Sequence, residues 1–373
     1  MNGRRLRIVV AAATLILAVI TPWSTSSAQA ATVVPDAYLY LPIDGGRAVV
    51  RWNGQAKGYP VERASVLLPG RFDSHGAGVF IYRRGRGPDA ILRVRTDGGT
   101  LALSKRTEIV NDWYEPLTGD FDGNGYTDIF WKADQWHTEK SYLWSFHADG
   151  SHTSVHFDDW LSRVSIRVAS TVDANADGIT DLLWFYDDQI WFMQPDGSHI
   201  ERPVGVTDTP GWTGAIGGNL GPDDGITRRR MVGIYEGDYE RLYTFNKAGQ
   251  STMKEIRPHV GNCCKYQDAV AGHFRNGYTT SLFFYSAGQP QFPELMQSIT
   301  AGGNISESPA PQISGRYTTT VGDFDGNGFD DILLSSRVGA TYLFSSDGTS
   351  FTKSDPPDVP EHSWVIALPV ASS

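Results

Sequence analysis

The chain has 373 residues and a formal net charge of −10. A protein that binds double-stranded nucleic acid needs a basic face to displace counterions, and the one conspicuous basic run is RRR at 228–230, so nucleic acid is excluded as a partner. Glycine and aromatic residues are spread evenly from 36 to 364 without a Pro/Ser-rich or charged linker, which predicts a single domain.

Residues 1–30 predict a secretory signal peptide. Three arginines precede an apolar run over 8–20, which is short for a membrane span, and Ala28 and Ala30 form the small-residue pattern that signal peptidase reads. We therefore expect cleavage after Ala30 and a secreted, extracellular mature protein over 31–373. The expected cleavage removes three arginines and no acidic residue, so the formal net charge changes from −10 for the whole chain to −13 for the mature protein. No later segment predicts a membrane span or a lipid anchor.

A short motif recurs along the chain. GDFDGNGYTDI at 119–129 returns as GDFDGNGFDDI at 322–332, and the related openings lie at 70–80, 171–184, 217–227 and 272–284. Their anchor residues, the first aspartate of the motif or its equivalent, are 46 to 54 residues apart. A catalytic centre needs each of its residues once, so a period of about fifty residues indicates a repeated architectural unit.

Each opening is followed by an apolar run and then by a hairpin signal. DLLWFY leads to IWFMQPDGSHIERPV, for example, and alternating residues on either side of Asp-Gly predict two antiparallel strands. No window has a sustained helical period. The unit is therefore a strand, an acidic loop, a strand and a hairpin, and four strands in about fifty residues are typical of one blade of a β-propeller.

The two ends of the chain complement each other. A seventh hairpin at 38–52 has no opening of its own, and residues 362–373 resemble a first strand that stops where its loop should begin. The sequence thus predicts an all-β, seven-bladed β-propeller with four-stranded blades, in which the N- and C-terminal strands share one split blade. Such closure removes the exposed edge of the sheet.

Three openings carry oxygen ligands on alternate residues, a pattern that suits calcium. Counted from the anchor, they offer side chains at positions 1, 3, 5 and 9 and a backbone carbonyl at position 7. An EF-hand is excluded because a glutamate at position 12 and flanking helices are missing, whereas ordinary Asp/Asn/Gly turns are the alternative. About three Ca²⁺ ions are expected, bound structurally by Asp120, Asp122, Asn124, Tyr126 and Asp128; Asp173, Asn175, Asp177, Ile179 and Asp181; and Asp323, Asp325, Asn327, Phe329 and Asp331.

With these three loops, the chain over 36–373 resembles the FG-GAP/VCBS-type repeat proteins, which include the integrin α-subunit propeller and secreted lectins. The resemblance implies a calcium-binding β-propeller that binds an extracellular carbohydrate or protein. The Phe-Gly and Gly-Ala-Pro signatures that name the family are absent from this chain.

The other three openings have lost the ligand pattern, and we expect no metal in them. Arg71 and His75 stand at ligand positions of one, His273 and Arg275 at those of another, and 219–227 contains a one-residue slip. An arginine is expected to bridge the carbonyls of such a loop instead.

A binding module is the preferred function, and an enzyme is less favoured. No serine nucleophile elbow, zinc-spaced His/Glu cluster or phosphate loop is present. Acidic pairs such as Asp158/Asp159 and Asp187/Asp188 leave open a polysaccharide lyase or glycoside hydrolase, and an integrin-like adhesin that binds protein is a further alternative. The resemblance to lectins and the many aromatic residues favour carbohydrate.

Aromatic residues about seven positions before the anchors define a candidate ligand face. Because an extended strand of this length spans roughly 20–25 Å, these residues should lie on the face opposite the calcium ions. Loops after each second strand should add Trp136, His137, Asp188 and Glu236. The expected ligand-binding residues are Trp113, Trp136, Trp212, Tyr266 and Trp364, and the alternative is that they only pack the blade ends.

Cys263 and Cys264 are the only cysteines and are adjacent in sequence. Export favours oxidation, so a vicinal disulfide that flattens the loop beside Tyr266 is one hypothesis, and two free or intermolecular thiols are the other.

Overall fold

The computed structural model describes the residues that make up the strands and most of their turns. These are residues 36–42, 45–62, 64–85, 88–96, 99–110, 113–133, 140–157, 168–175, 177–184, 189–204, 212–218, 230–236, 239–246, 248–257, 268–276, 280–285, 294–299, 305–315, 317–336, 341–355 and 363–368. The chain divides into two units, 1–32 and 33–373. The first unit, with the predicted signal peptide, lies outside the described residues, and all of the described strands belong to the second.

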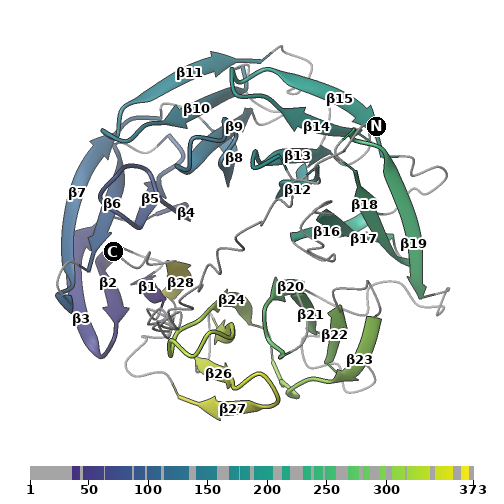
Figure 1. Cartoon of the computed structure of the whole chain (residues 1–373). Coiled ribbons are helices and arrows are strands. Elements are labelled where there is room, and N and C mark those ends of the chain that lie inside the picture. Colours follow the sequence, from purple (N-terminus) through teal and green to yellow (C-terminus); the bar gives the residue numbers. More distant parts are fainter. Residues whose placement is uncertain are drawn as a thin grey trace, which may run out of the picture. The chain divides into compact units, whose positions relative to one another are not determined.

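Within the described residues the protein is all-β, as predicted, and contains no α-helix. In the described part of the chain, no helix is long and apolar enough to cross a membrane. The strands pair antiparallel into four-stranded sheets, the blades of a β-propeller (Figure 1). The four-stranded unit predicted from the fifty-residue period is therefore confirmed.

The described strands form seven four-stranded sheets. In hydrogen-bonding order they are β28 (Ser363–Leu368), β1 (Ala37–Pro42), β2 (Gly46–Trp52) and β3 (Gln55–Val61); β4 (Val66–Gly70), β5 (Gly78–Tyr82), β6 (Asp89–Arg95) and β7 (Ala102–Glu108); β8 (Tyr114–Gly119), β9 (Asp128–Ala133), β10 (Tyr142–Phe146) and β11 (His152–His156); β12 (Val168–Val172), β13 (Asp181–Trp184), β14 (Gln189–Met193) and β15 (His199–Pro203); β16 (Trp212–Gly218), β17 (Arg230–Glu236), β18 (Tyr239–Phe245) and β19 (Ser251–Arg257); β20 (Asp268–Gly272), β21 (Thr280–Tyr285), β22 (Leu295–Ile299) and β23 (Ile305–Pro309); and β24 (Thr318–Gly322), β25 (Asp331–Ser335), β26 (Tyr342–Ser346) and β27 (Phe351–Ser354).

The first of these sheets joins the two ends of the chain, as the sequence predicts. β28 pairs antiparallel with β1 in a register that runs from Ala37 opposite Leu368 to Pro42 opposite Ser363. The first strands of the sheets also contact one another in a closed cycle: β28 with β4, then β8, β12, β16, β20, β24 and β28 again. The paired ends thus supply one of the contacts that close this cycle.

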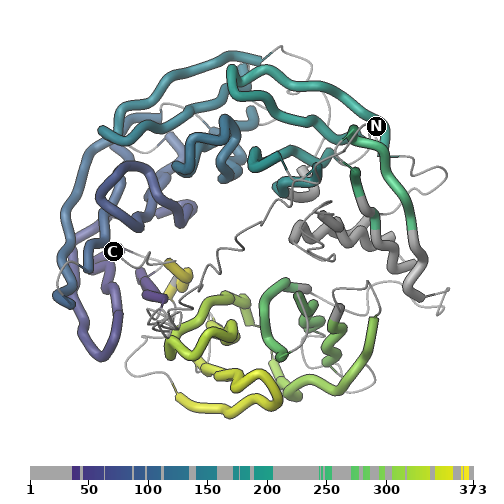
Figure 2. The backbone as a smooth tube through the Cα atoms, in the orientation of Figure 1, coloured from purple at the N-terminus to yellow at the C-terminus, as the bar shows by residue number. Residues whose placement is uncertain are grey.

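The apolar core lies between successive sheets. One cluster packs Phe80 and Tyr82 of β5 against Trp131 of β9, and the next packs Phe130 of β9 against Trp184 of β13. Trp131, Trp184 and Trp191 are at most 1% exposed, so these tryptophans belong to the packing between sheets. The turn after β14 also reaches β11, because Gly197 lies close to the side chain of Val155. Figure 2 traces the backbone of these two neighbouring sheets.

A recurring pair of hydrogen bonds ties each loop to the next sheet. The backbone N–H of the anchor residue, at loop position 1, donates to a side-chain oxygen of the residue at position 8 of the following loop. The backbone N–H of that position-8 residue donates in return to the carbonyl of the anchor. The Asp120 N–H donates to Thr180 Oγ1 at 3.0 Å, and the Thr180 N–H donates to the Asp120 carbonyl at 2.7 Å. We call this reciprocal pair the clasp.

The clasp is found at four junctions among the described residues. Besides Asp120–Thr180 it joins Arg71 to Thr127, His273 to Asp330 and Asp323 to Asp36. The last of these is at the chain ends: the Asp36 N–H donates to the Asp323 carbonyl at 2.6 Å, and Asp36 Oδ2 accepts from the Asp323 N–H at 3.1 Å. Asp36 directly precedes β1 and therefore supplies position 8 for the sheet shared by the two ends.

The clasp explains why a glycine precedes the anchor in the repeated motif. A Cβ on Gly119 would lie 2.5 Å from Thr180 Cγ2, and one on Gly70 would lie 2.6 Å from Thr127 Cγ2. Neither glycine has a positive φ. The motif needs glycine there for close approach of the next sheet and not for turn geometry.

The clasp predicts a loss of stability in Thr180→Val. Valine keeps the shape of threonine but removes Oγ1, which leaves the Asp120 N–H without its acceptor. We expect the free energy of unfolding to fall by about 1 kcal/mol or more, measured by chemical denaturation. Thr153→Val is the matched control, because Thr153 lies exposed on β11. Equal stability of the two variants would contradict a stabilising role for the clasp.

Candidate functional site

Two of the three predicted calcium loops bring their carboxylates together. Oxygen atoms of Asp120, Asp122 and Asp128 lie within 4.8 Å of one another, and so do those of Asp323, Asp325 and Asp331. Two oxygens that bind one Ca²⁺ at about 2.4 Å are at most about 5 Å apart, so these triads fit a single cation of that size. Three hard, anionic oxygen donors are also the chemistry that Ca²⁺ prefers.

The aspartate at position 9 is buried in all three loops and ties the loop to its own sheet. Asp128, Asp181 and Asp331 are 0% exposed. Each accepts one N–H from loop position 2 and one from the third strand of the sheet; Asp128 accepts from Phe121 and Phe146, both at 2.8 Å. Burial, as the largest cause, raises the pKa of Asp128 and Asp181 to about 8 and that of Asp331 to about 7, and neighbouring aspartates add to each shift.

The aspartate at position 1 fixes the turn of the loop. Its carboxylate accepts the N–H groups of positions 5 and 6: Asp120 from Asn124 and Gly125, Asp173 from Asp177 and Gly178, and Asp323 from Asn327 and Gly328. The glycine at position 6 has a positive φ in each loop, which is the sharp turn that the pattern predicts. This is the geometry of acidic turns as well as of calcium loops.

The residue at position 5 accepts the N–H of position 7. The donors are Tyr126, Ile179 and Phe329, whose carbonyls are the predicted backbone ligands. In the loop at 173–181, position 5 is Asp177, and its second carboxylate oxygen accepts a hydrogen bond from the side-chain amide of Asn175 at 2.9 Å. Among the described residues, the carboxylates of this loop do not form a triad like the other two.

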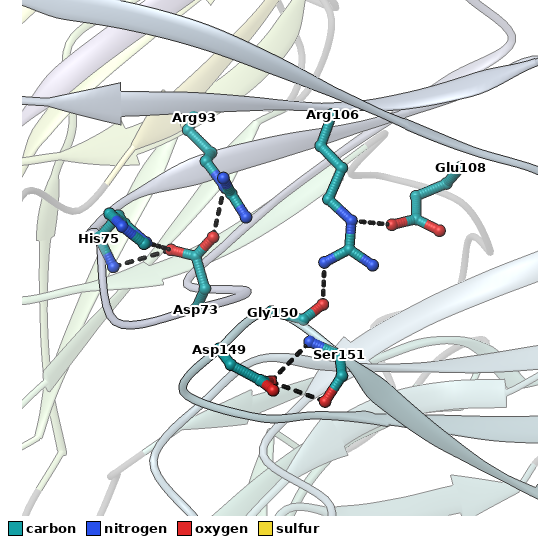
Figure 3. A network of polar contacts seen from close by, with 8 residues as sticks. All are labelled: Asp73, His75, Arg93, Arg106, Glu108, Asp149, Gly150 and Ser151. Atoms are coloured by element: carbon teal, nitrogen blue, oxygen red, sulfur yellow. Dashed lines mark hydrogen bonds and ion pairs between the residues drawn. The ribbon is translucent and has the colours of Figure 1, made fainter.

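The divergent loop at 71–79 holds an arginine where the acidic loops gather carboxylates (Figure 3). Its one remaining acid, Asp73, is 2% exposed and forms an ion pair with Arg93 of β6. Asp73 also accepts the His75 N–H at 2.8 Å, and His75 Nδ1 lies 3.2 Å from the same oxygen. In this loop an arginine side chain therefore supplies the positive charge beside the buried carboxylate.

The same network of polar contacts also joins the sheet of β4–β7 to the sheet of β8–β11. Arg106 of β7 pairs with Glu108 and donates to the carbonyl of Gly150, in the turn between β10 and β11 (Figure 3). The Ser74 N–H donates to the Ala148 carbonyl of that turn at 2.9 Å. In the divergent loop after β20, Asn276 donates to Gly348 of the next turn in the same way, also at 2.9 Å.

The sequence predicts that an arginine bridges carbonyls at this loop, without a choice among the arginines of the repeat. Arg71 stands at position 1, yet its guanidinium lies over the ring of Tyr126, 5.1 Å from the centroid, in the next loop. Arg93, on a different strand, pairs with Asp73 instead. A charged residue within the apolar run AILRVR was the signal that could have identified it. His273 likewise turns to the next loop, with Nδ1 3.2 Å from the Gly328 carbonyl, and the predicted loop at 219–227 lies outside the described residues.

The aromatic residues of the predicted ligand face stand at the starts of first strands. Trp113 directly precedes β8, Trp212 begins β16 and Trp364 is the second residue of β28. Strands β8 and β16 reach their loops at the opposite end, so these positions and the loop anchors are separated by a strand length. Trp113 is 40% exposed. The backbone of Trp212 is the register partner of Glu236, at the end of β17, so the structure brings these two predicted residues together.

Several predicted residues lie outside the part of the chain that the structure describes. They are Trp136, His137, Asp188, Cys263, Cys264 and Tyr266.

Comparison with known proteins supports the fold. No protein-family model matches this chain, and no curated protein sequence is similar to it. Solved β-propeller structures are similar in fold: AztD from Citrobacter koseri (12% identity, TM-score 0.51, 90% of this chain and 98% of that one) and a putative 6-phosphogluconolactonase from Bacteroides uniformis (13%, 0.52, 90% and 98%). A putative 6-phosphogluconolactonase from Bacteroides fragilis is similar at 13% identity and a TM-score of 0.51, over 90% of this chain and 96% of that one. The chain is thus a β-propeller, and at these identities the similarity extends to the fold alone.

The acidic loops predict a cost for a fourth carboxylate in the absence of divalent cations. The Asn124 amide donates to the Phe146 carbonyl at 2.8 Å and to Asp122 at 2.9 Å. Asn124→Asp removes both donors and adds a charge beside the triad, so in EDTA we expect the free energy of unfolding to fall by about 1–3 kcal/mol. Asn53→Asp, in an exposed turn, is the control for charge alone. Similar stability of the two variants would show that the Asn124 amide is dispensable.

Proposed function

We propose that this protein is a secreted, calcium-stabilised β-propeller of the FG-GAP/VCBS repeat type that binds extracellular carbohydrate. The observation that carries the proposal is the position of Trp113, an indole 40% exposed at the end of β8 opposite the acidic loop. Large aromatic side chains elsewhere in the described core are buried between sheets. An exposed indole face offers the platform on which the C–H face of a sugar ring stacks.

Calcium has a structural role in this proposal. The triads of the first and third acidic loops would bind one ion each, and the loop at 173–181 would bind a third after its Asp177 side chain turns. Burial disfavours the ionised form of the position-9 aspartates, as their raised pKa values indicate. A divalent cation would offset that cost and keep the carboxylates charged, which couples ion binding to the stability of the fold.

The calcium proposal predicts a rise in melting temperature with Ca²⁺. Because the ion binds only the native state, each occupied site adds about 2.7 kcal/mol at a hundredfold excess over its Kd. We expect calorimetric titration to find about three sites and EDTA to lower the melting temperature. Asp122→Asn should remove one site, whereas Asp149→Asn, which changes an exposed residue in the turn between β10 and β11, should remove none. Absence of both calcium binding and an EDTA effect would refute the role of calcium.

The ligand proposal predicts that Trp113→Ala and Trp212→Ala weaken glycan binding. Aromatic anchors at the centre of a site often contribute 2 kcal/mol or more, so affinity should drop by roughly tenfold or more for glycans found by array screening. Met253→Ala, which truncates a 52% exposed side chain on β19, is the control. Melting temperatures should stay near that of the parent. Capture of a protein but no glycan would favour the adhesin, and release of cleaved products would favour the enzyme.

A further inference from the structure

The turn that follows β5 places an arginine in a backbone conformation that arginine rarely adopts. Arg84 has φ +39° and the next residue, Gly85, has φ +63°. The same succession of two left-handed residues occurs at Asn53 (φ +45°) and Gly54 (φ +73°). Asparagine is the usual non-glycine residue in this region, whereas a long side chain with a Cβ is strained there. The chain therefore uses the ordinary Asn-Gly solution in one turn and departs from it in the other.

The fold leaves one buried polar atom of the Arg84 side chain without a hydrogen bond. Its Nε is buried and has no hydrogen-bond partner among the described residues. The neighbouring Arg83 is paired, since its guanidinium contacts Glu62. Backbone strain at a residue with an unpaired buried polar atom is a signal of function.

Arg84 lies next to the exposed indole of the proposed ligand face. A Cβ on Gly85 would be 3.2 Å from Trp113 Nε1 and 3.5 Å from its Cδ1, so the edge of the indole rests against the residue that follows Arg84. A Cβ at this position would crowd the indole, because 3.2 Å is shorter than an ordinary van der Waals contact. The turn that carries Arg84 and the exposed indole of Trp113 are therefore neighbours in the structure.

Two buried polar residues hold this surface rigid. Asp89, 1% exposed, accepts the Arg83 N–H and the Val110 N–H, both at 2.7 Å, which joins the turn to the segment that leads to Trp113. The Tyr82 hydroxyl accepts the Tyr114 N–H at 2.9 Å. Tyr82 directly precedes Arg83 and Tyr114 directly follows Trp113, so this hydrogen bond also joins the turn to the strand that follows the indole. A site whose parts are fixed before binding loses little entropy when a ligand arrives.

We infer that Trp113 and Arg84 form a subsite for a sugar that carries a carboxylate, so that the ligand class is a uronic-acid-containing glycan. The indole face stacks on the ring, and the planar, permanently charged guanidinium binds the carboxylate in a bidentate pair. This inference rests on the proposed function. Because the protein as a whole is strongly acidic, with a net charge of −10, a single carboxylated ring at a local cation suits it better than a dense polyanion.

The test compares acidic glycans with their uncharged methyl esters. Oligogalacturonate, oligomannuronate and glucuronate-containing oligosaccharides, each with its methyl ester, are titrated against the calcium-loaded protein. We expect at least one acid to bind about tenfold more tightly than its ester. Arg84→Gln should abolish that difference while binding of the ester is unchanged. Arg83→Gln removes the same charge from the same turn but a paired one, and should keep the preference.

Stability provides a second, ligand-independent measurement. Arg84→Gly relieves the left-handed strain, so its melting temperature should equal or exceed that of the parent, although the preference for acids is lost. Asn53→Gly is the matched control and should change the melting temperature little. A lower melting temperature for Arg84→Gly would mean that the fold itself needs the arginine and would overturn the inference.

The outcomes for ligand class and for function are distinct. If neutral glycans bind and acids show no preference that depends on Arg84, the subsite is wrong but carbohydrate binding stands. If no glycan on the array binds at all, the proposed function fails, and the inference fails with it.

Discussion

The reciprocal hydrogen bonds between loop position 1 of one sheet and position 8 of the next set the geometry on which the other features depend. At Gly70 and Gly119 they hold the loop so close to the next sheet that a Cβ on the residue before the anchor would collide with the threonine at position 8. They also operate at the chain ends, where Asp36 acts as the partner of Asp323. A loop in this fold is thus shaped by the sheet that follows it as much as by its own sequence.

This constraint accounts for what the acidic loops share and where they differ. Positions 1, 8 and 9 serve the architecture, since they fix the turn, the clasp and the tie to the third strand. The carboxylates are buried by these roles, which raises the pKa of Asp128 and creates a need for compensating positive charge. The loop at 71–79 meets that need with Arg93. Under the calcium proposal, the ion in the acidic loops and Arg93 in the loop at 71–79 would both supply positive charge beside a buried carboxylate.

The sequence predicted the features that depend on period and local pattern. The fifty-residue spacing, the Asp-Gly hairpins and the incomplete ends were sufficient for the four-stranded unit and for the pairing of β28 with β1. Features that depend on contacts between strands distant in sequence were missed. The pairing of Asp73 with Arg93 was not evident because it depends on how far a side chain of another strand reaches across the sheet. The role of Gly119 was not evident because the residue that it approaches, Thr180, belongs to the next repeat.

The two ends of a first strand carry different constraints. At the loop end, every carboxylate oxygen of Asp120 and Asp128 is engaged by backbone N–H groups, so sequence there is set by folding. At the other end, the turn after β5 tolerates a strained Arg84 and an indole left partly in water. Strain and exposed aromatic surface both cost stability, and their coincidence beside the hydrogen-bonded pair Tyr82 and Tyr114 is the basis of the proposed recognition surface. Asn53 and Gly54 show the form that the turn takes when folding alone determines it.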